Sequence, residues 1–343
     1  MIVSPQFYAG SAKNVAPVTP SNRIVGLDFT KGALVLIMVL YHWTNYFVAF
    51  DDSTFRYLRF LTPSFIFITG FLIAQVYLPK SSRPDARIPE RMAVRGCKLL
   101  GIALFLNLAL SGMQGSIQTR TTVQSPEEMA LAFFVGTAPV AFAILVPIAY
   151  LLLVSAGLFV VHRMVPPIFH VVSIALSLSA LICEWQHLGS GHLETLSIGM
   201  LGVSAGHISM QNIQRLLQHP VLTLAAYGAY AYAIAVWNAV YLLQIVGVCL
   251  NVAVLFWLGE AGQSTSLARL LARLGGYSLF AYIAQIAILR VLRTGLRPLG
   301  SSMAVSLLAL VLGIVCTVLS VELVERARRG NLRVNQWYGA VFS

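Results

Sequence analysis

The chain has 343 residues, of which 58% are hydrophobic and only 10% are charged. Soluble domains carry about 25% charged residues, so this composition excludes an ordinary soluble protein and indicates a polytopic membrane protein. The formal net charge is +11, but the basic residues lie in short runs between apolar segments rather than on one soluble domain, which argues against nucleic acid as a partner.

The first 22 residues contain prolines but no apolar run before a cleavage site. We therefore expect residues 1–22 to form a disordered cytoplasmic tail and not a signal peptide. A transmembrane domain is expected over residues 23–326, followed by a cytoplasmic C-terminal tail over residues 327–343. The four cysteines lie far apart, with no C-x-x-C spacing, so neither a metal site nor a disulfide framework is expected.

Ten apolar runs are long enough to cross a bilayer, so the expected fold class is all-α, a bundle of about ten transmembrane helices. The fourth run is overlong and contains Pro139 and Pro147, which favours a kinked or re-entrant part. The seventh and eighth runs are separated only by Trp237 and Asn238. Merging them would change the number of spans from even to odd. The runs cover residues 27–50, 57–79, 92–112, 134–162, 167–185, 192–211, 220–236, 239–258, 276–295 and 303–324.

The distribution of lysine and arginine predicts the orientation. With the N-terminus in the cytoplasm, only six of the 23 basic residues fall outside, as the positive-inside rule favours. Three of the six lie close together, which leaves two alternatives: they line an internal cavity, or a span is miscounted. The six residues are Arg56, Arg59, Arg120, Arg290, Arg293 and Arg297.

The first span carries a histidine deep inside an apolar helix. Lys31 and His42 are eleven residues apart, which is close to three helical turns and returns both side chains to nearly the same face. The rise between them is about 16 Å, so His42 is expected about halfway across a hydrocarbon core about 30 Å thick. Asp28 precedes Lys31 by three residues and is expected to pair with it.

A charged group at that depth costs about 2.5 to 3.5 kcal/mol on insertion scales, so ionisable residues there usually face a protein interior or a wet cavity. His42 is therefore a functional candidate. The alternative is that it only hydrogen-bonds a neighbouring helix, as polar side chains in membrane bundles often do.

The loop over residues 79–98 is the most basic in the chain. Arg91, Arg95 and Lys98 recur at helical spacing where the third span begins, which is typical of a site for a ligand that bears phosphates. The alternative is an orientation signal that also contacts anionic lipid headgroups.

A family resemblance rests on Arg23, Leu27-Asp28, Lys31-Gly32 and His42, followed by the motif FIFITGF at 65–71. This pattern resembles the transmembrane acyltransferase superfamily, which includes the acyltransferase-3 proteins, OpgC-like proteins and relatives of heparan-alpha-glucosaminide N-acetyltransferase. Arg91 and Arg95 look like the paired arginines of that superfamily. The chain departs from the pattern at Lys31, which replaces an arginine and loses bidentate phosphate binding, and at Gln285, which stands where a histidine is common.

The resemblance implies a bacterial inner-membrane enzyme that transfers a short acyl group, acetyl above all, from cytosolic acyl-CoA to a hydroxyl or amine of a carbohydrate acceptor. His42 is then the general base or the covalent acyl carrier, and Asp28 is the second catalytic residue, which holds Lys31 or Arg23 in place; no metal is expected. The phosphates of acyl-CoA are expected at Lys31, Arg91, Arg95 and Lys98, and the substrate at Arg23, Asn45, Thr69, Tyr282 and Gln285.

Two other functions stay open from the sequence. A proton-coupled transporter or flippase would use His42 to couple protons, but no internal repeat of broken helices supports it. A non-catalytic membrane component that binds acyl-CoA is favoured by the substitutions at Lys31 and Gln285. Gln285 is also expected to hydrogen-bond a neighbouring helix.

Overall fold

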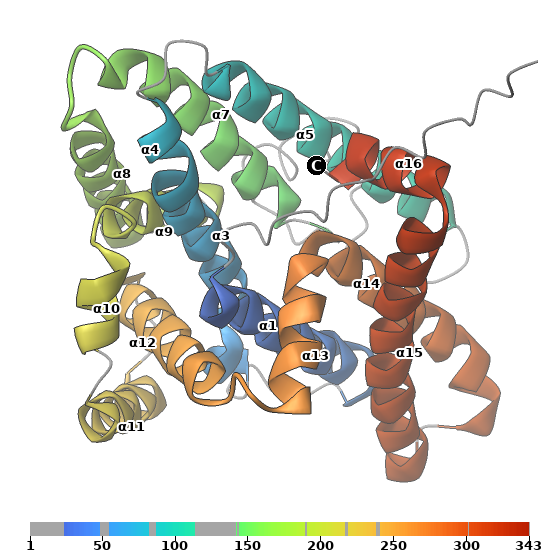
Figure 1. Cartoon of the computed structure of the whole chain (residues 1–343). Coiled ribbons are helices and arrows are strands. Elements are labelled where there is room, and N and C mark those ends of the chain that lie inside the picture. Colours follow the sequence, from blue (N-terminus) through green and yellow to red (C-terminus); the bar gives the residue numbers. More distant parts are fainter. Residues whose placement is uncertain are drawn as a thin grey trace, which may run out of the picture.

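The computed structural model describes residues 24–48, 55–81, 87–113, 142, 144–188, 191–216, 219–237, 241–300 and 302–342. These residues form helices and their connections, with no strand among them (Figure 1). Eight helical segments in the described ranges are long and apolar enough to cross a membrane. The protein is therefore an all-α polytopic membrane protein, as its composition predicts.

Most helices contain one expected apolar run each, and two of them are extended by π-helical turns. The first span is α1 (Val25–Trp43), which continues as the π-helix η1 (Thr44–Val48). The second comprises η2 (Arg56–Leu58), α3 (Leu61–Leu72), the π-helix η3 (Ile73–Tyr77) and α4 (Leu78–Ser81). The other long segments are α5 (Ile88–Met113), α7 (Leu145–His162), α8 (Ile168–Trp185), α12 (Tyr241–Ala261), α14 (Ser278–Leu296) with η4 (Arg297–Leu299), and α15 (Met303–Gly330).

Two expected spans are shorter than a full crossing. Helix α9 (Gly191–Ala205) has 15 residues, about 22 Å of helix, and the rest of the expected run 192–211 breaks and restarts as α10 (Met210–Leu216). Helix α11 (Pro220–Val236) has 17 residues and is separate from α12, so the seventh and eighth runs do not merge. The part of the fourth run before residue 142, with Pro139, lies outside the described residues.

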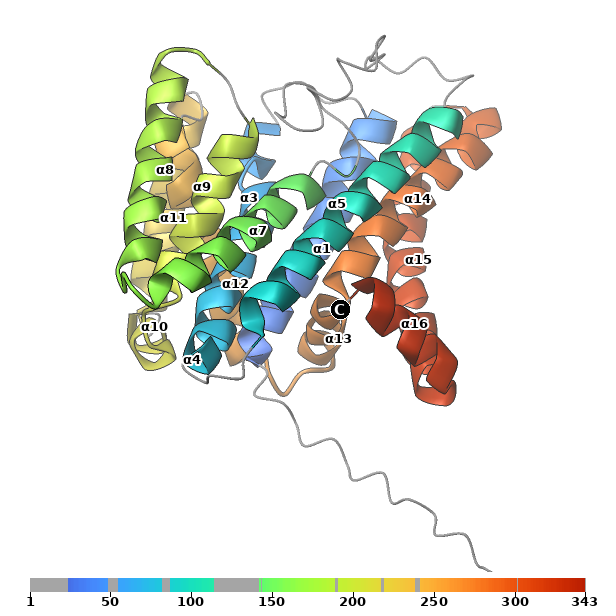
Figure 2. The ribbon, with the colours of Figure 1, turned by 90° about the horizontal axis from the view of Figure 1, so that it is seen from above.

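The two ends of the bundle differ. Helices α4, α10, α13 (Ser266–Gly276) and α16 (Leu332–Phe342) gather at the end where α1 begins, which we call the near side (Figure 2). The connections from α8 to α9 and from α14 to α15 lie at the opposite end, the far side. Helix α1 crosses between them.

Helix α1 lies at the centre of the bundle, in contact with α3, α12, α13, α14 and α15 (Figure 1). Leu34, Val35 and Val39 of α1 are fully buried. Five neighbouring helices, and not lipid alone, surround α1. Whatever polar groups α1 carries are thereby held inside the protein.

Helices α3 and α9 approach each other at backbone distance. A Cβ on Gly70 would lie 2.0 Å from the carbonyl oxygen of Gly199, and a Cβ on Gly202 would lie 2.1 Å from that of Phe67. Small residues allow this approach, which drives helix association in membranes through close packing. The glycine of the FIFITGF motif is therefore needed for packing.

The amphipathic helix α13 was not predicted, because its 11 residues are too few for a span. Thr265 caps it by accepting a hydrogen bond from the backbone N–H of Ala268, 3.1 Å away. Its Arg273 pairs with Glu322 of α15 at 2.5 Å and with Glu325 at 3.1 Å.

The C-terminal segment 327–343 is largely helical. Helix α15 continues to Gly330, and α16 follows within two residues. The guanidinium of Arg328 lies 4.1 Å from the ring centre of Tyr338 and 5.3 Å from that of Tyr277. Asn335 of α16 also accepts a hydrogen bond from the Arg328 Nε. These contacts hold α16 against α14 and α15.

Candidate active site

The near side carries the expected pair at the start of α1. Lys31 Nζ lies 2.6 Å from Asp28 Oδ1, and the two side chains are 19% and 16% exposed. The three-residue spacing places both groups on one helical face. The pair holds a lysine ammonium at the near side, partly accessible to a ligand that arrives there.

The basic residues of α5 lie at the same end of the bundle. Arg95 donates a hydrogen bond to the hydroxyl of Tyr77 in η3, at 2.6 Å. Arg91 and Lys98 are exposed. Their spacing puts all three on one face of α5, and Tyr77 fixes the central one. Tyr77 was not singled out in the sequence, because its contact with Arg95 joins two different spans.

An apolar cavity of about 150 Å³ lies beside this end of α1. Leu27 of α1 lines it together with Phe67 and Phe71 of the FIFITGF motif. Ala253 and Phe256 of α12 complete the opposite wall. The motif phenylalanines thus line an apolar space next to the Asp28–Lys31 pair.

His42 lies further along α1, in an aromatic surrounding. Its ring is 5.3 Å from that of Tyr41, 5.9 Å from that of Tyr46, which stacks on it, and 6.5 Å from that of Tyr282 in α14. The Nε2 atom is buried and has no hydrogen-bond partner among the described residues. A buried polar atom without a partner is costly, so this nitrogen is available for a substrate.

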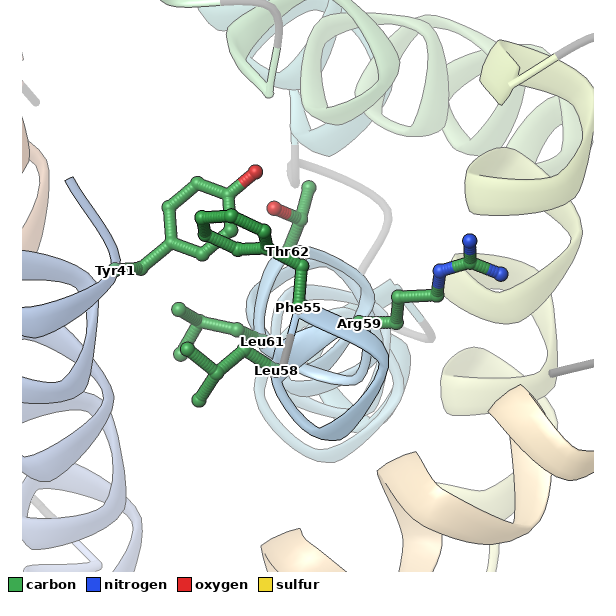
Figure 3. A pocket seen from close by; sticks show the side chains of 6 residues that line it. All are labelled: Tyr41, Phe55, Leu58, Arg59, Leu61 and Thr62. Carbon is green, nitrogen blue, oxygen red and sulfur yellow. The ribbon is translucent and has the colours of Figure 1, made fainter. Parts of the chain in front are cut away.

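The far side opens a cavity of about 230 Å³ next to this histidine (Figure 3). Tyr41 enters it from α1, and Phe55, Arg59 and Thr62 line it from the start of the second span. In Figure 3 the guanidinium of Arg59 points away from Tyr41. The ring of Tyr41 thus lines this cavity and also lies 5.3 Å from that of His42.

Helix α14 supplies Tyr282 and Gln285 to the same region. Both side chains are buried. The prediction that Gln285 hydrogen-bonds a neighbouring helix is wrong for the described residues, because neither its amide nitrogen nor its amide oxygen has a partner there. Gln285 is a second polar group without a partner among the described residues, one helical turn beyond Tyr282.

Arg290 and Arg293 also belong to α14, not to the external connection in which the sequence places them. The Nε of Arg290 is buried and has no hydrogen-bond partner among the described residues. Arg293 lies 5.8 Å from the ring centre of Tyr46. The signal for both was visible in the sequence, since they stand out against the positive-inside rule.

The remaining expected site residues are placed differently. Arg23 lies outside the described residues. The hydroxyl of Thr69 donates to the carbonyl oxygen of Phe65 in its own helix, at 2.8 Å. The amide of exposed Asn45 donates to the carbonyl oxygen of Tyr41, at 3.2 Å. Thr69 and Asn45 are therefore satisfied locally, whereas His42 and Gln285 are not.

A family model for an acyltransferase domain, that of the acyltransferase-3 family, matches residues 24–323. The chain belongs to the acyltransferase-3 family. The match covers all the spans except the end of α15, so the resemblance found in the first spans extends to the whole bundle. Neither a search of curated proteins nor a search of solved structures gave a match.

Membership in the acyltransferase-3 family makes the chain a multi-pass membrane acyltransferase. Within the described ranges, no three His, Cys, Asp or Glu side chains gather as metal ligands would.

Proposed function

We propose that this acyltransferase moves a short acyl group, acetyl above all, from acyl-CoA to a hydroxyl or amine of a carbohydrate. The observation that carries the proposal is the buried, unpartnered Nε2 of His42, which lies between the near-side basic residues and the far-side cavity. A donor and an acceptor can then reach one base from opposite ends of the bundle. We further propose that the near side faces the bacterial cytoplasm, because the basic residues concentrate on the near side and cytoplasmic loops carry an excess of lysine and arginine.

The donor is proposed to bind at the near side. Arg95, held by Tyr77, and Lys31, held by Asp28, offer fixed positive charges to the phosphates of coenzyme A. Arg91 and Lys98 add exposed positive charges on the same face of α5. The apolar cavity lined by Phe67 and Phe71 suits the pantetheine arm and the acyl chain.

The reaction is proposed to proceed by direct attack. The acceptor oxygen or nitrogen forms a bond to the thioester carbonyl carbon while His42 Nε2 takes its proton. The carbon–sulfur bond then breaks, and the imidazolium returns the proton to the coenzyme A sulfur. The products are the acylated carbohydrate and free coenzyme A thiol.

The test uses the purified full chain in lipid nanodiscs with labelled acetyl-CoA and a panel of glycans. We expect thiol release that depends on the acceptor, and a loss of at least 100-fold in His42→Ala, the usual contribution of a general base. His219→Ala is the matched control, because His219 is exposed and makes no side-chain cap to α11. Equal rates in wild type and His42→Ala would refute the role of His42.

Two outcomes would replace the proposal with one of its rivals. Uptake of a polar solute driven by a pH gradient, without acyl transfer, would indicate the transporter. Binding of acyl-CoA with no thiol release for any acceptor would indicate a non-catalytic component.

A further inference from the structure

Helix α14 carries three arginines on one face that leads from His42 to the far side. Arg290, Arg293 and Arg297 follow one another at spacings of three and four residues, which places them along one helical face. Arg290 is the innermost and lies about two helical turns beyond Tyr282, whose ring is 6.5 Å from that of His42. Arg297 is the outermost and is exposed in η4.

The charge of Arg290 is uncompensated within the part of the chain that the structure describes. Five ion pairs occur there, and all involve the near-side ends of α1, α13 and α15. None includes Arg290 or Arg293. A cation at membrane depth is normally paired with an anion or marks a substrate path, because leaving it without a counter-charge is costly.

Three buried polar groups of α1 and α14 lack a hydrogen-bond partner among the described residues. His42 Nε2, the Gln285 amide and Arg290 Nε are all buried without partners. Gln285 is fully buried. Buried polar groups in a packed interior normally form hydrogen bonds with one another, unless a ligand provides the partner. The group lacking here is one that accepts hydrogen bonds from a guanidinium.

We propose that Arg290 and Arg293 bind a carboxylate or phosphate of the acceptor, so that the preferred carbohydrate substrates are anionic. The proposal rests on the proposed function, since it names the substrate class of the same site. The planar guanidinium forms paired hydrogen bonds with either anion, which would fix the acceptor beside His42. The anionic group takes no part in bond making or breaking.

A different role for Arg290 has a distinct kinetic signature. A guanidinium that stabilised the oxyanion of the thioester carbonyl would act on every acceptor and would lower kcat. One that binds the anionic group of the acceptor acts on anionic acceptors alone and lowers their affinity, so that it changes KM. Neutral and anionic acceptors built on the same sugar therefore separate the two roles.

The experiment compares glucose, glucuronate and glucose 1-phosphate as acceptors for the full chain in nanodiscs, with labelled acetyl-CoA. We expect wild type to show a KM at least tenfold lower for one of the anions than for glucose. Preference for glucuronate indicates a uronic acid acceptor, and preference for glucose 1-phosphate a phosphate-bearing one. Arg290→Gln should raise the KM for the preferred anion at least tenfold and leave the KM for glucose unchanged. The KM of Arg290→Lys for that anion should lie between those of wild type and Arg290→Gln.

Arg269→Gln is the matched control, because Arg269 is an exposed near-side arginine of α13 that bonds only Ser266 among the described residues. Arg293→Gln is the second variant if Arg290→Gln does not fold. Equal KM values for glucose and both anions in wild type would overturn the proposal. So would an Arg290→Gln variant whose kcat falls equally for all three acceptors while KM stays unchanged.

A binding measurement separates this proposal from the proposed function. The Tm of wild type should rise with the preferred anion and not with glucose, and the rise should vanish in Arg290→Gln. That pattern without thiol release from acetyl-CoA would refute acyl transfer from acyl-CoA and support the anion site. Thiol release from acetyl-CoA, with no effect of either anion on Tm or KM, would support acyl transfer from acyl-CoA and refute the anion site.

Discussion

Gly275 of α13 lies directly on the backbone of Asp28 in α1. A Cβ on Gly275 would be 1.8 Å from the Asp28 carbonyl oxygen, and one on Gly32 would be 1.9 Å from the carbonyl oxygen of Leu271. The two helices therefore touch through paired glycines, as small residues permit in membranes. The contact fixes the turn of α1 that carries the Asp28–Lys31 pair.

Gly275→Ala should destabilise the protein, because the added methyl group meets backbone that cannot give way. We expect a cost of about 1 to 3 kcal/mol, as for overpacked cores, and a lower Tm in detergent. Gly228→Ala in α11 is the control, because no atom lies within 4 Å of the added Cβ. It should be neutral or stabilise by about 0.5 to 1 kcal/mol. Equal Tm values for both variants would contradict the glycine contact.

Tyr77→Phe should weaken the binding of acyl-CoA, because it removes the hydroxyl that holds Arg95. A hydrogen bond to a charged group contributes about 1.5 to 3 kcal/mol, so KM for acyl-CoA should rise about tenfold with kcat unchanged. Tyr232→Phe, at an exposed tyrosine of α11, is the control. An unchanged KM for acyl-CoA in Tyr77→Phe and in Arg95→Gln would show that α5 does not contribute to the donor site.

Ala253→Phe should fill the apolar cavity beside Leu27 and raise KM for acyl-CoA about tenfold, because the pantetheine arm would lose its space. Val246→Phe on the same helix is the matched control, since Val246 is 46% exposed. Steady-state kinetics with acetyl-CoA as the varied substrate measures the effect. If both variants leave KM unchanged, the donor does not use this cavity.

Direct attack and a covalent acyl-histidine predict different exchange reactions. A covalent intermediate would let the enzyme exchange labelled coenzyme A into acetyl-CoA without any acceptor, as in ping-pong catalysis. We expect no such exchange, because His42 is proposed as a base. Exchange in wild type that His42→Ala abolishes would establish His42 as the acyl carrier.

Arg328→Ala should loosen α16 from the near side. Arg328 lies over the rings of Tyr277 and Tyr338, and an exposed cation–π contact contributes about 0.5 to 1 kcal/mol. Hydrogen exchange should become faster in residues 332–342 and stay unchanged in α1. Arg333→Ala, which keeps these contacts, is the control, and equally fast exchange in both variants would argue against the Arg328 contact.

The sequence by itself determined the features that depend on the thickness of the bilayer and on the period of the α-helix. Apolar run length and scarce charge determine the class and nearly all spans, because a segment in hydrocarbon must satisfy its backbone within a helix. The Asp28–Lys31 pair and the position of His42 about three turns beyond Lys31 follow from one helix and its 3.6-residue turn. Helix α13 was missed because it is too short to cross, and α9 was overextended because apolar composition does not mark a bend.

Only the tertiary structure decided what surrounds His42. Tyr282, Gln285 and Arg290 are more than 200 residues away in the chain, and no local period brings them to α1. Packing of α14 on α1 does so, and it places Arg290 inside the bundle instead of in a loop. Side-chain contacts between distant helices depend on which helix surfaces pack together, and the hydropathy of the sequence does not predict that packing.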